Sequence, residues 1–140
     1  MRARIIAEAR AWIGTPYLHR ASCKGAGVDC LGLVRGVWRA VRGTEPEPLP
    51  HYAPDWAEAS RAEQLVAAGA RHLVPVPAEA VRPGDVLLFR WRAHLPAKHA
   101  AILVEPGRMV HAHDGIAVAE VHFAPWWQRR LAFTFAFPGA

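Results

Sequence analysis

The chain has 140 residues, of which 52% are hydrophobic and 21% charged, the composition of an ordinary folded protein. We expect one domain over residues 1–140 with one hydrophobic core. The length is too short for two well-packed domains, and the composition makes disorder of most of the chain unexpected. Seventeen Lys and Arg against 12 Asp and Glu give a net charge of +5. The cations are scattered and match no nucleic-acid-binding motif, so we expect no nucleic-acid partner.

The sequence predicts no contact with the membrane interior. No window contains enough consecutive apolar residues to span a bilayer, so we expect no membrane insertion. Residues 1–14 interleave apolar side chains with Arg and Glu and lack the apolar stretch of a secretory signal. We therefore expect synthesis in the cytoplasm without a signal peptide, with some other carrier for any role outside it.

Two helices are predicted in the first third of the chain, separated by a glycine-bearing loop over residues 14–28. Helical spacing of apolar residues predicts the first helix over 3–13, ended by Gly14, and the second over 30–42, followed by Gly43. The predicted apolar positions of the first helix are Ile5, Ile6, Ala9, Trp12 and Ile13, and those of the second are Leu33, Val34, Val37, Trp38 and Val41.

The rest of the chain is predicted to be mainly strands. Residues 44–54 are proline-rich and should form a surface loop, and Asp55 with Glu58 resembles a capping box that opens a third helix ending near Gly69. Strands are predicted over 73–76, 86–91, 99–104, 109–113, 116–123 and 131–137, with a helical turn over 125–129. Helices followed by consecutive strands predict an α+β fold, with N-terminal helices packed on an antiparallel β-sheet.

Cys30 is the first candidate for chemistry. Asp29 is a favourable N-cap type, which places Cys30 near the first position of the second helix. A thiol there faces unpaired backbone N–H groups and the positive end of the helix dipole, which favour the reactive thiolate, while the Asp29 charge opposes it. On position alone, a small buried cysteine that only packs the helix start is the more common case. A disulfide with Cys23 is an alternative that a domain of this size does not need.

Histidines supply candidate partners for this thiol. A thiol nucleophile needs an imidazole beside the sulfur and a third polar group to orient the ring. His99 begins an apolar strand, and a turn at residues 106–107 brings His111 near the same level on the next strand, so a cross-strand contact is predicted. His113 shares a face with His111. The three histidines could instead form a zinc site, which would leave Cys30 without a role.

Five short motifs resemble those of the NlpC/p60 family of cell-wall cysteine peptidases, in family order over about residues 5–135. Each motif is weak alone, but five in order are a strong resemblance. They are Trp12–Tyr17 (the entry motif), Asp29–Val34 (the nucleophile motif), Arg82–Phe89 (the Pro-Gly-Asp turn and its strand), His99–Val104 (the strand of the base) and Met109–Ala112 (the strand of the third triad member).

This resemblance implies a papain-like fold and a cysteine peptidase that cuts peptidoglycan stem peptides, typically between D-glutamate and a diamino acid. Cys30 would attack the peptide carbonyl, His99 would act as its base and His111 would orient His99. Tyr17 would lie beside the nucleophile and, with Asp29, would bind the substrate. The resemblance implies no metal and no cofactor.

Two departures from the family pattern keep other functions open. Leu31 stands where the family has a Ser that helps to bind the free amine of a stem peptide, and residues 19–24 replace the usual Gly-Gly beside the site. A non-catalytic tail-assembly or wall-binding module on the same fold would fit both departures. An acyltransferase or amidase would use the same catalytic residues and differ only in its product.

One segment resembles a narrower branch of the family. The run Cys30–Arg39 is similar to the peptidases of gene transfer agents and related phage-like particles. We therefore expect phage-like tail or baseplate proteins as partners. As part of such a particle, the chain would reach peptidoglycan in the periplasm.

Overall fold

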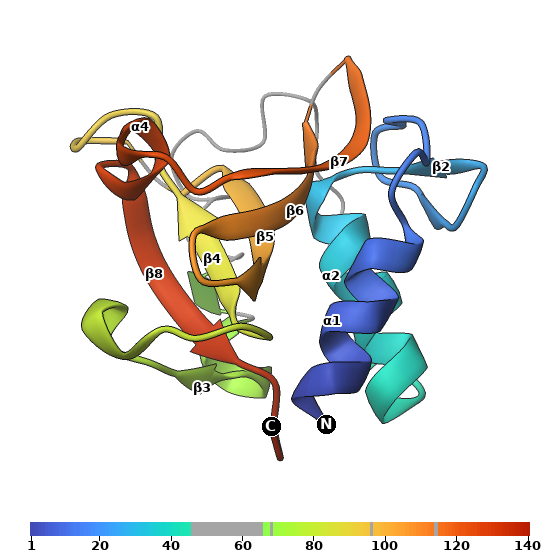
Figure 1. Ribbon diagram of the computed structural model, residues 1–140, viewed down its shortest axis with the longest axis horizontal. Helices are drawn as coiled ribbons and strands as arrows, with labels where there is room; N and C mark the ends of the chain where they lie inside the picture. The colour runs from blue at the N-terminus through green and yellow to red at the C-terminus, as the bar shows by residue number, and fades with distance from the viewer. Residues whose placement is uncertain (46–65, 68, 96, 114) are drawn as a thin grey trace.

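The structure, a computed structural model, describes residues 1–45, 66–67, 69–95, 97–113 and 115–140. It confirms the predicted α+β fold, in which two N-terminal helices precede the strands of the main antiparallel sheet (Figure 1). The elements are α1 (Arg2–Ala11), β1 (Ser22–Cys23), β2 (Gly27–Val28), α2 (Cys30–Arg42), β3 (Val74–Pro75), the 3-10 helix η1 (Ala78–Ala80), β4 (Val86–Phe89), β5 (His99–Glu105), β6 (Arg108–His113), β7 (Ile116–His122), α4 (Pro125–Gln128) and β8 (Leu131–Ala136).

The main sheet of the described residues has six strands in the order β3-β8-β4-β5-β6-β7, and every neighbouring pair is antiparallel. α1 and α2 lie side by side against one face of this sheet (Figure 1). None of the helices in the described ranges has the length and apolar composition needed to span a membrane.

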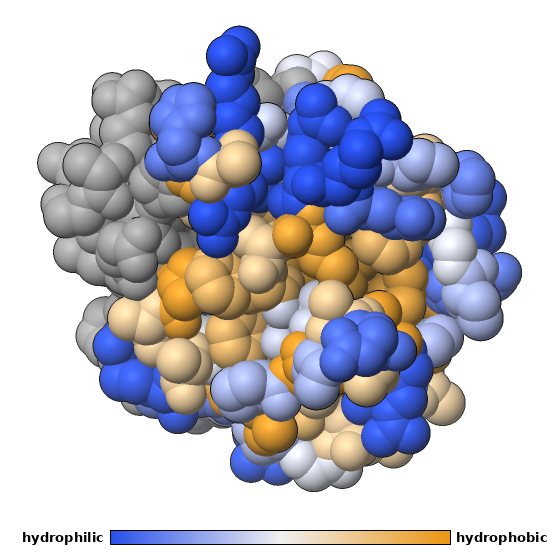
Figure 2. All heavy atoms as spheres, turned by 90° about the vertical axis from the view of Figure 1, so that its left-hand side faces the viewer, coloured by the Kyte–Doolittle hydropathy of each residue, from blue (hydrophilic) through white to orange (hydrophobic). Residues whose placement is uncertain are grey.

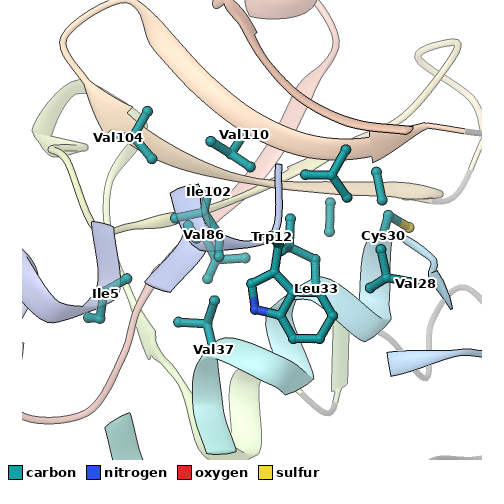
Figure 3. Packing of buried hydrophobic residues seen from close by; sticks show 14 of the residues in the cluster. Ile5, Trp12, Val28, Cys30, Leu33, Val37, Val86, Ile102, Val104 and Val110 are labelled. Carbon is teal, nitrogen blue, oxygen red and sulfur yellow. The ribbon is translucent and has the colours of Figure 1, made fainter. Parts of the chain in front are cut away.

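The main core lies between the two helices and the sheet. Figure 3 shows buried side chains from α1, α2, β4, β5 and β6 meeting in one layer, with Cys30 at its end. The helices approach closely because Gly36 has no side chain: a Cβ there would lie 2.1 Å from Cζ2 of Trp12. Helix packing therefore depends on a specific glycine in α2, and it carries Cys30 to the edge of the core.

The opposite face of the sheet has a second, smaller core. Because side chains alternate along a strand, Val86 and Leu88 face the helices while Leu87 and Phe89 face this second core. Phe89 and Trp91 also contact Trp127, because α4 lies on this face of the sheet. Figure 2 shows a band of hydrophobic residues across the face at the left of Figure 1, with hydrophilic residues gathered above it.

The prediction of an unstructured loop over residues 14–28 is wrong in part. Ser22 pairs with Val28 and Cys23 with Gly27, which makes the short antiparallel hairpin of β1 and β2. Gly25, at a φ of +83°, allows the tight turn between them. Strands of two residues show no alternation of apolar and polar side chains, so the pattern could not reveal them.

The first helix is shorter than predicted. It ends at Ala11, and Ile13, which the spacing assigns to the apolar face, is 46% exposed on the turn that follows. The chain leaves the helix to meet the far edge of the sheet. The Gly14 N–H donates to the Val118 carbonyl at 2.8 Å, and the Val118 N–H donates to the Thr15 carbonyl at 2.9 Å.

The predicted third helix lies mostly outside the described residues, including its capping box of Asp55 and Glu58. Its predicted end at Gly69 is wrong, because residues 69–72 are helical and the Leu73 N–H donates to the Gly69 carbonyl at 2.7 Å. Gly69 does not end the helix but packs closely on Phe135: a Cβ there would lie 3.1 Å from that ring.

The predicted strands are present, with small shifts of their ends. The strand expected over 86–91 ends at Phe89, where the pairing with β8 is irregular, and the Arg90 N–H then donates to the Arg130 carbonyl. The strand expected over 73–76 is reduced to two residues. This early end of β4 turns Trp91 away from the sheet and toward the histidines.

Candidate active site

Cys30 is the first residue of α2, as predicted, and Asp29 is the N-cap. One carboxylate oxygen of Asp29 accepts a hydrogen bond from the Gly32 N–H at 2.7 Å, and the other accepts from the Arg20 N–H, also at 2.7 Å. Asp29 is buried and does not line the cleft described below, so in this structure it positions the start of the helix. Its predicted contact with a substrate stays a prediction.

A close backbone contact fixes the helix start against the preceding loop. The Asp29 N–H donates to the Ala21 carbonyl, and a Cβ at Gly32 would lie 2.0 Å from that same oxygen. Only glycine fits there, which explains the Gly two residues after the cysteine. The altered loop over residues 19–24 therefore still holds the nucleophile motif in place.

The electrostatic surroundings of Cys30 oppose the thiolate. Burial raises the pKa of the thiol to about 12, and the charge of Asp29 adds to the increase, whereas backbone N–H groups of Ala100, Leu31 and Cys30 itself lower it. The expectation that the helix start favours the thiolate is thus wrong in its net direction, because desolvation outweighs the N–H groups. The contact with Ala100 places the sulfur beside the residue that follows His99.

His99 and His111 face each other between β5 and β6. His99 Nε2 lies 2.8 Å from His111 Nδ1, which confirms the predicted cross-strand contact. Burial lowers the pKa of His99 well below its usual value and that of His111 to about 4, so both rings are neutral at pH 7. In the tautomer in which His99 donates from Nε2, its Nδ1 carries no proton and can accept one.

His113 joins these rings without making a metal site. Its ring centroid lies 5.3 Å from that of His99 and 5.7 Å from that of His111. The facing nitrogens of His99 and His111 are already used in a hydrogen bond with each other. Within the described ranges, no three His, Cys, Asp or Glu side chains are arranged to hold a metal ion. The structure therefore gives the zinc alternative no support.

Cys30 and His99 come from different elements and line one cleft of about 600 Å³. Tyr17 lines the same cleft, as the motif comparison implies, whereas His111 lies behind His99. The structure thus brings together a thiol, an imidazole and a second imidazole bonded to the first. This set can transfer a proton from sulfur to nitrogen, and its use in catalysis stays a prediction.

Three tryptophans around the histidines escaped the sequence analysis. Trp91 stacks on His99, with ring centroids 5.7 Å apart and an interplanar angle of 21°. Trp127 lies edge-on to His111 at 5.3 Å, and Trp126 packs against Trp127. Six tryptophans in a chain of 140 residues are an unusual number, and this was the one available signal. Nothing in their spacing indicates that residues 91 and 126–127 meet.

Three cations of the cleft were also missed. Arg92, Lys98 and Arg130 line it together with Cys30 and His99. They come from the segment after β4, the residue before β5 and the segment before β8. Their separation along the chain hides them from any motif, because only the folded sheet brings these three segments to one end.

Comparisons with known proteins agree on one family. The profile of the NlpC/P60 family matches residues 14–134. The gamma-DL-glutamyl hydrolase of Bacillus subtilis (strain 168) is 32% identical over 128 residues, which are 91% of this chain and 27% of that protein. The chain therefore spans only about a quarter of the length of this relative.

Solved structures share the fold. The NlpC/p60 domain of the peptidoglycan hydrolase SagA has a TM-score of 0.71 at 22% identity, over 98% of this chain and 99% of that one. An NlpC/P60 family protein from Bacillus cereus ATCC 10987 has a TM-score of 0.73 at 18% identity, over 98% of this chain and 40% of that one. These similarities confirm the predicted papain-like α+β architecture.

Proposed function

Because this chain belongs to the NlpC/P60 family of cysteine peptidase-type peptidoglycan hydrolases, we propose that it hydrolyses peptidoglycan stem peptides with Cys30 as its nucleophile. One observation carries the proposal: Cys30 and His99 line the same cleft while His99 Nε2 is bonded to His111 Nδ1. A thiol, a base and a group that orients the base are the parts that acyl transfer through sulfur requires.

In the first half of the reaction, His99 Nδ1 takes the proton of Cys30 as the sulfur attacks the peptide carbonyl carbon. Burial disfavours a charge on either group alone, so the proton passes directly between neighbours in the cleft. Backbone N–H groups at the start of α2, with Tyr17, stabilise the oxyanion. The C–N bond then breaks as His99 returns the proton to the leaving amine, and a thioester remains.

In the second half, water replaces the amine. His99 accepts a proton from the water as its oxygen attacks the thioester carbon, and the proton then returns to the Cys30 sulfur when the C–S bond breaks. His111 keeps the His99 ring in one orientation through both steps by the 2.8 Å contact. The products are a carboxylate and a free amine.

For the bond that is cut, we propose the link between γ-D-glutamyl and a diamino acid. The relative from Bacillus subtilis is named for γ-DL-glutamyl hydrolysis, and its similarity covers 91% of this chain. Leu31 at the position of the family's Ser removes a hydroxyl from the nucleophile motif. We therefore expect a weaker requirement for a free amine at the end of the stem peptide.

The experiment is a digest of purified sacculi by the wild type and by the Cys30→Ala variant, with the products identified by mass. We expect peptides with a new amino terminus on the diamino acid, and loss of this product in the variant. Undiminished cleavage by a folded Cys30→Ala variant would exclude the thiol mechanism. The absence of any cleavage by the wild type would favour a wall-binding module, and products of acyl transfer or of an amidase would identify the other alternative.

We also propose that the chain works in the periplasm as part of a phage-like tail or gene transfer agent particle. The proposal rests on the similarity of the run Cys30–Arg39 to peptidases of such particles. Mass spectrometry of particles purified from the producing cells should detect this chain together with tail or baseplate proteins. Its recovery only outside the particle fraction would contradict the proposal.

A further inference from the structure

The cleft that contains Cys30 carries positive charge without counter-charge. Arg92, Lys98 and Arg130 line it, and no Asp or Glu does so among the residues that the structure describes. A cleft lined by one sign of charge raises the local concentration of ligands of the opposite sign. The surroundings of the nucleophile therefore favour an anionic group.

Several cations elsewhere in the described chain are paired with carboxylates. Arg10 lies 2.7 Å from Glu105 and 2.9 Å from Glu120, and Arg35 lies 2.6 Å from Glu45. None of the ion pairs found within the described ranges includes a cation of the cleft. The three cations of the cleft thus have no carboxylate partner among the described residues and can pair with an anionic ligand.

One of the three cations is held in place before any ligand arrives. The guanidinium carbon of Arg130 lies 3.7 Å from the ring centre of Trp126, and its Nη1 donates to the Trp126 carbonyl at 2.8 Å. This stacking leaves other guanidinium N–H groups available for an acceptor. Lys98 is placed beside His99 by a backbone hydrogen bond to Phe89 at 2.8 Å.

We propose that Arg92, Lys98 and Arg130 form a subsite that binds a free carboxylate beside the scissile bond. This inference rests on the proposed function and specifies its substrate. When a glutamyl residue is linked through its side-chain carboxyl, its α-carboxyl lies within a few bonds of the amide that is cut. The subsite selects γ-glutamyl peptides whose α-carboxyl is free and ionised over those in which it is an α-carboxamide.

The test compares two synthetic stem peptides that differ only at this group, one with the α-carboxylate of D-glutamate and one with the α-carboxamide. For the wild type we expect kcat/KM to be about tenfold or more higher on the carboxylate peptide, as charge-assisted hydrogen bonds predict. In the triple variant Arg92→Gln, Lys98→Gln and Arg130→Gln, this preference should disappear. The loss should appear in KM for the carboxylate peptide, with the carboxamide peptide changed by less than about twofold.

Arg129→Gln is the matched control. Arg129 is the exposed neighbour of Arg130 and does not line the cleft among the described residues, so its loss should leave the preference intact. Equal losses on both peptides in the triple variant would overturn the inference, because they would show a general effect on folding or catalysis. No preference in the wild type would overturn it as well.

Binding to the Cys30→Ala variant separates the two proposals. Titration with each uncleaved peptide, followed by tryptophan fluorescence or calorimetry, should give about tenfold tighter binding of the carboxylate form. If the variant binds the carboxylate peptide more tightly but the wild type cleaves neither peptide, the carboxylate subsite is supported and the proposed hydrolase activity is rejected. If cleavage depends on Cys30 but is equally fast with the α-carboxylate and the α-carboxamide, the hydrolase activity is supported and the carboxylate subsite is rejected.

Discussion

The two walls of the cleft are built in different ways. On the helix wall, Cys30 is held through contacts on the backbone: the Asp29 carboxylate caps the helix N–H groups, and Gly32 leaves room for the Ala21 carbonyl, which lies too close for any side chain there. On the strand wall, His99 is held by side chains, with His111 bonded to one nitrogen and Trp91 stacked on the ring. The first wall fixes where the sulfur is, and the second fixes how the ring is oriented.

This difference assigns different tasks to the two walls. Burial disfavours charge on both of them, since it raises the pKa of Cys30 to about 12 and lowers that of His99. The resting site is therefore a neutral thiol and a neutral imidazole in one cleft, and in the proposed mechanism chemistry begins only when the proton crosses from one wall to the other. Apart from Cys30 itself, changes to the helix wall should act mainly on stability, and changes to the strand wall mainly on rate and pH dependence.

Removal of the proposed base should give the largest effect. In His99→Ala we expect peptide cleavage to fall by about 10³-fold, the scale of general-base catalysis. Because the pKa of the Cys30 thiol is about 12, alkylation of Cys30 by iodoacetamide at pH 7 should fall with it. Cys23 is an exposed free thiol and serves as the internal control, with unchanged labelling. Unchanged labelling of both cysteines in the variant would contradict the separation of tasks.

Acid should lower the free energy of unfolding through His111 on the strand wall. An unfolded chain protonates His111 near pH 6.5, whereas the folded chain does so only near its pKa of about 4, so stability is lost as pH falls from 6.5 through 4. The contribution of this group to the free energy of unfolding is on the order of 3 kcal/mol over that range. Urea unfolding at several pH values measures it. His111→Asn should show a shallower pH dependence, and an identical slope would contradict the expectation.

Gly36→Ala tests whether a change in the packing of α2, which carries the helix wall, acts on stability. Alanine usually stabilises a helix relative to glycine, but here its Cβ would meet the Trp12 ring, so we expect a loss of about 1–3 kcal/mol in the free energy of unfolding. The double variant with Trp12→Leu should lose less than the two single changes together, because the collision is removed. Chemical denaturation of all three variants tests this coupling, and strict additivity would argue against it.

Trp91→Leu should give the smallest effect, on rate rather than stability. Loss of the stacked ring admits water to His99, so the pKa of His99 should rise toward its usual value and the acid limb of kcat should move to higher pH. We expect a loss of about 1 kcal/mol in transition-state stabilisation, or several-fold in rate. Trp38→Leu is the control, since Trp38 packs near Phe137 and does not line the cleft among the described residues. Equal pH profiles for the two variants would contradict the prediction.

The sequence predicted the helix wall better than the strand wall. A cap residue, a glycine and a helical apolar pattern lie within a few residues of Cys30, so local rules place the thiol at the first position of α2. The contact of His99 with His111 was also within reach, because a single hairpin connects them. Both are short-range features of the chain.

Long-range features were not predictable in the same way. Trp91 and Trp127 meet because β4 and β8 are neighbours in the sheet, and strand order cannot be read from spacing. The raised pKa of Cys30 depends on burial by the whole core, which a local argument about helix dipoles omits. Local rules therefore placed the proposed reacting groups, whereas tertiary structure decided their protonation and their surroundings.

The two backbone hydrogen bonds between residues 14–15 and Val118 bear on whether the sheet can pair with another molecule at high concentration. β7 is an outermost strand, and such a strand can serve as a template for strand addition by another molecule. Here the segment after α1 occupies part of its hydrogen-bonding groups. At the opposite margin, β3 has only two residues, one of them Pro75, which has no N–H to offer. Among the described residues, both outer strands thus offer few free backbone groups to another molecule, which disfavours pairing of this sheet with a second copy.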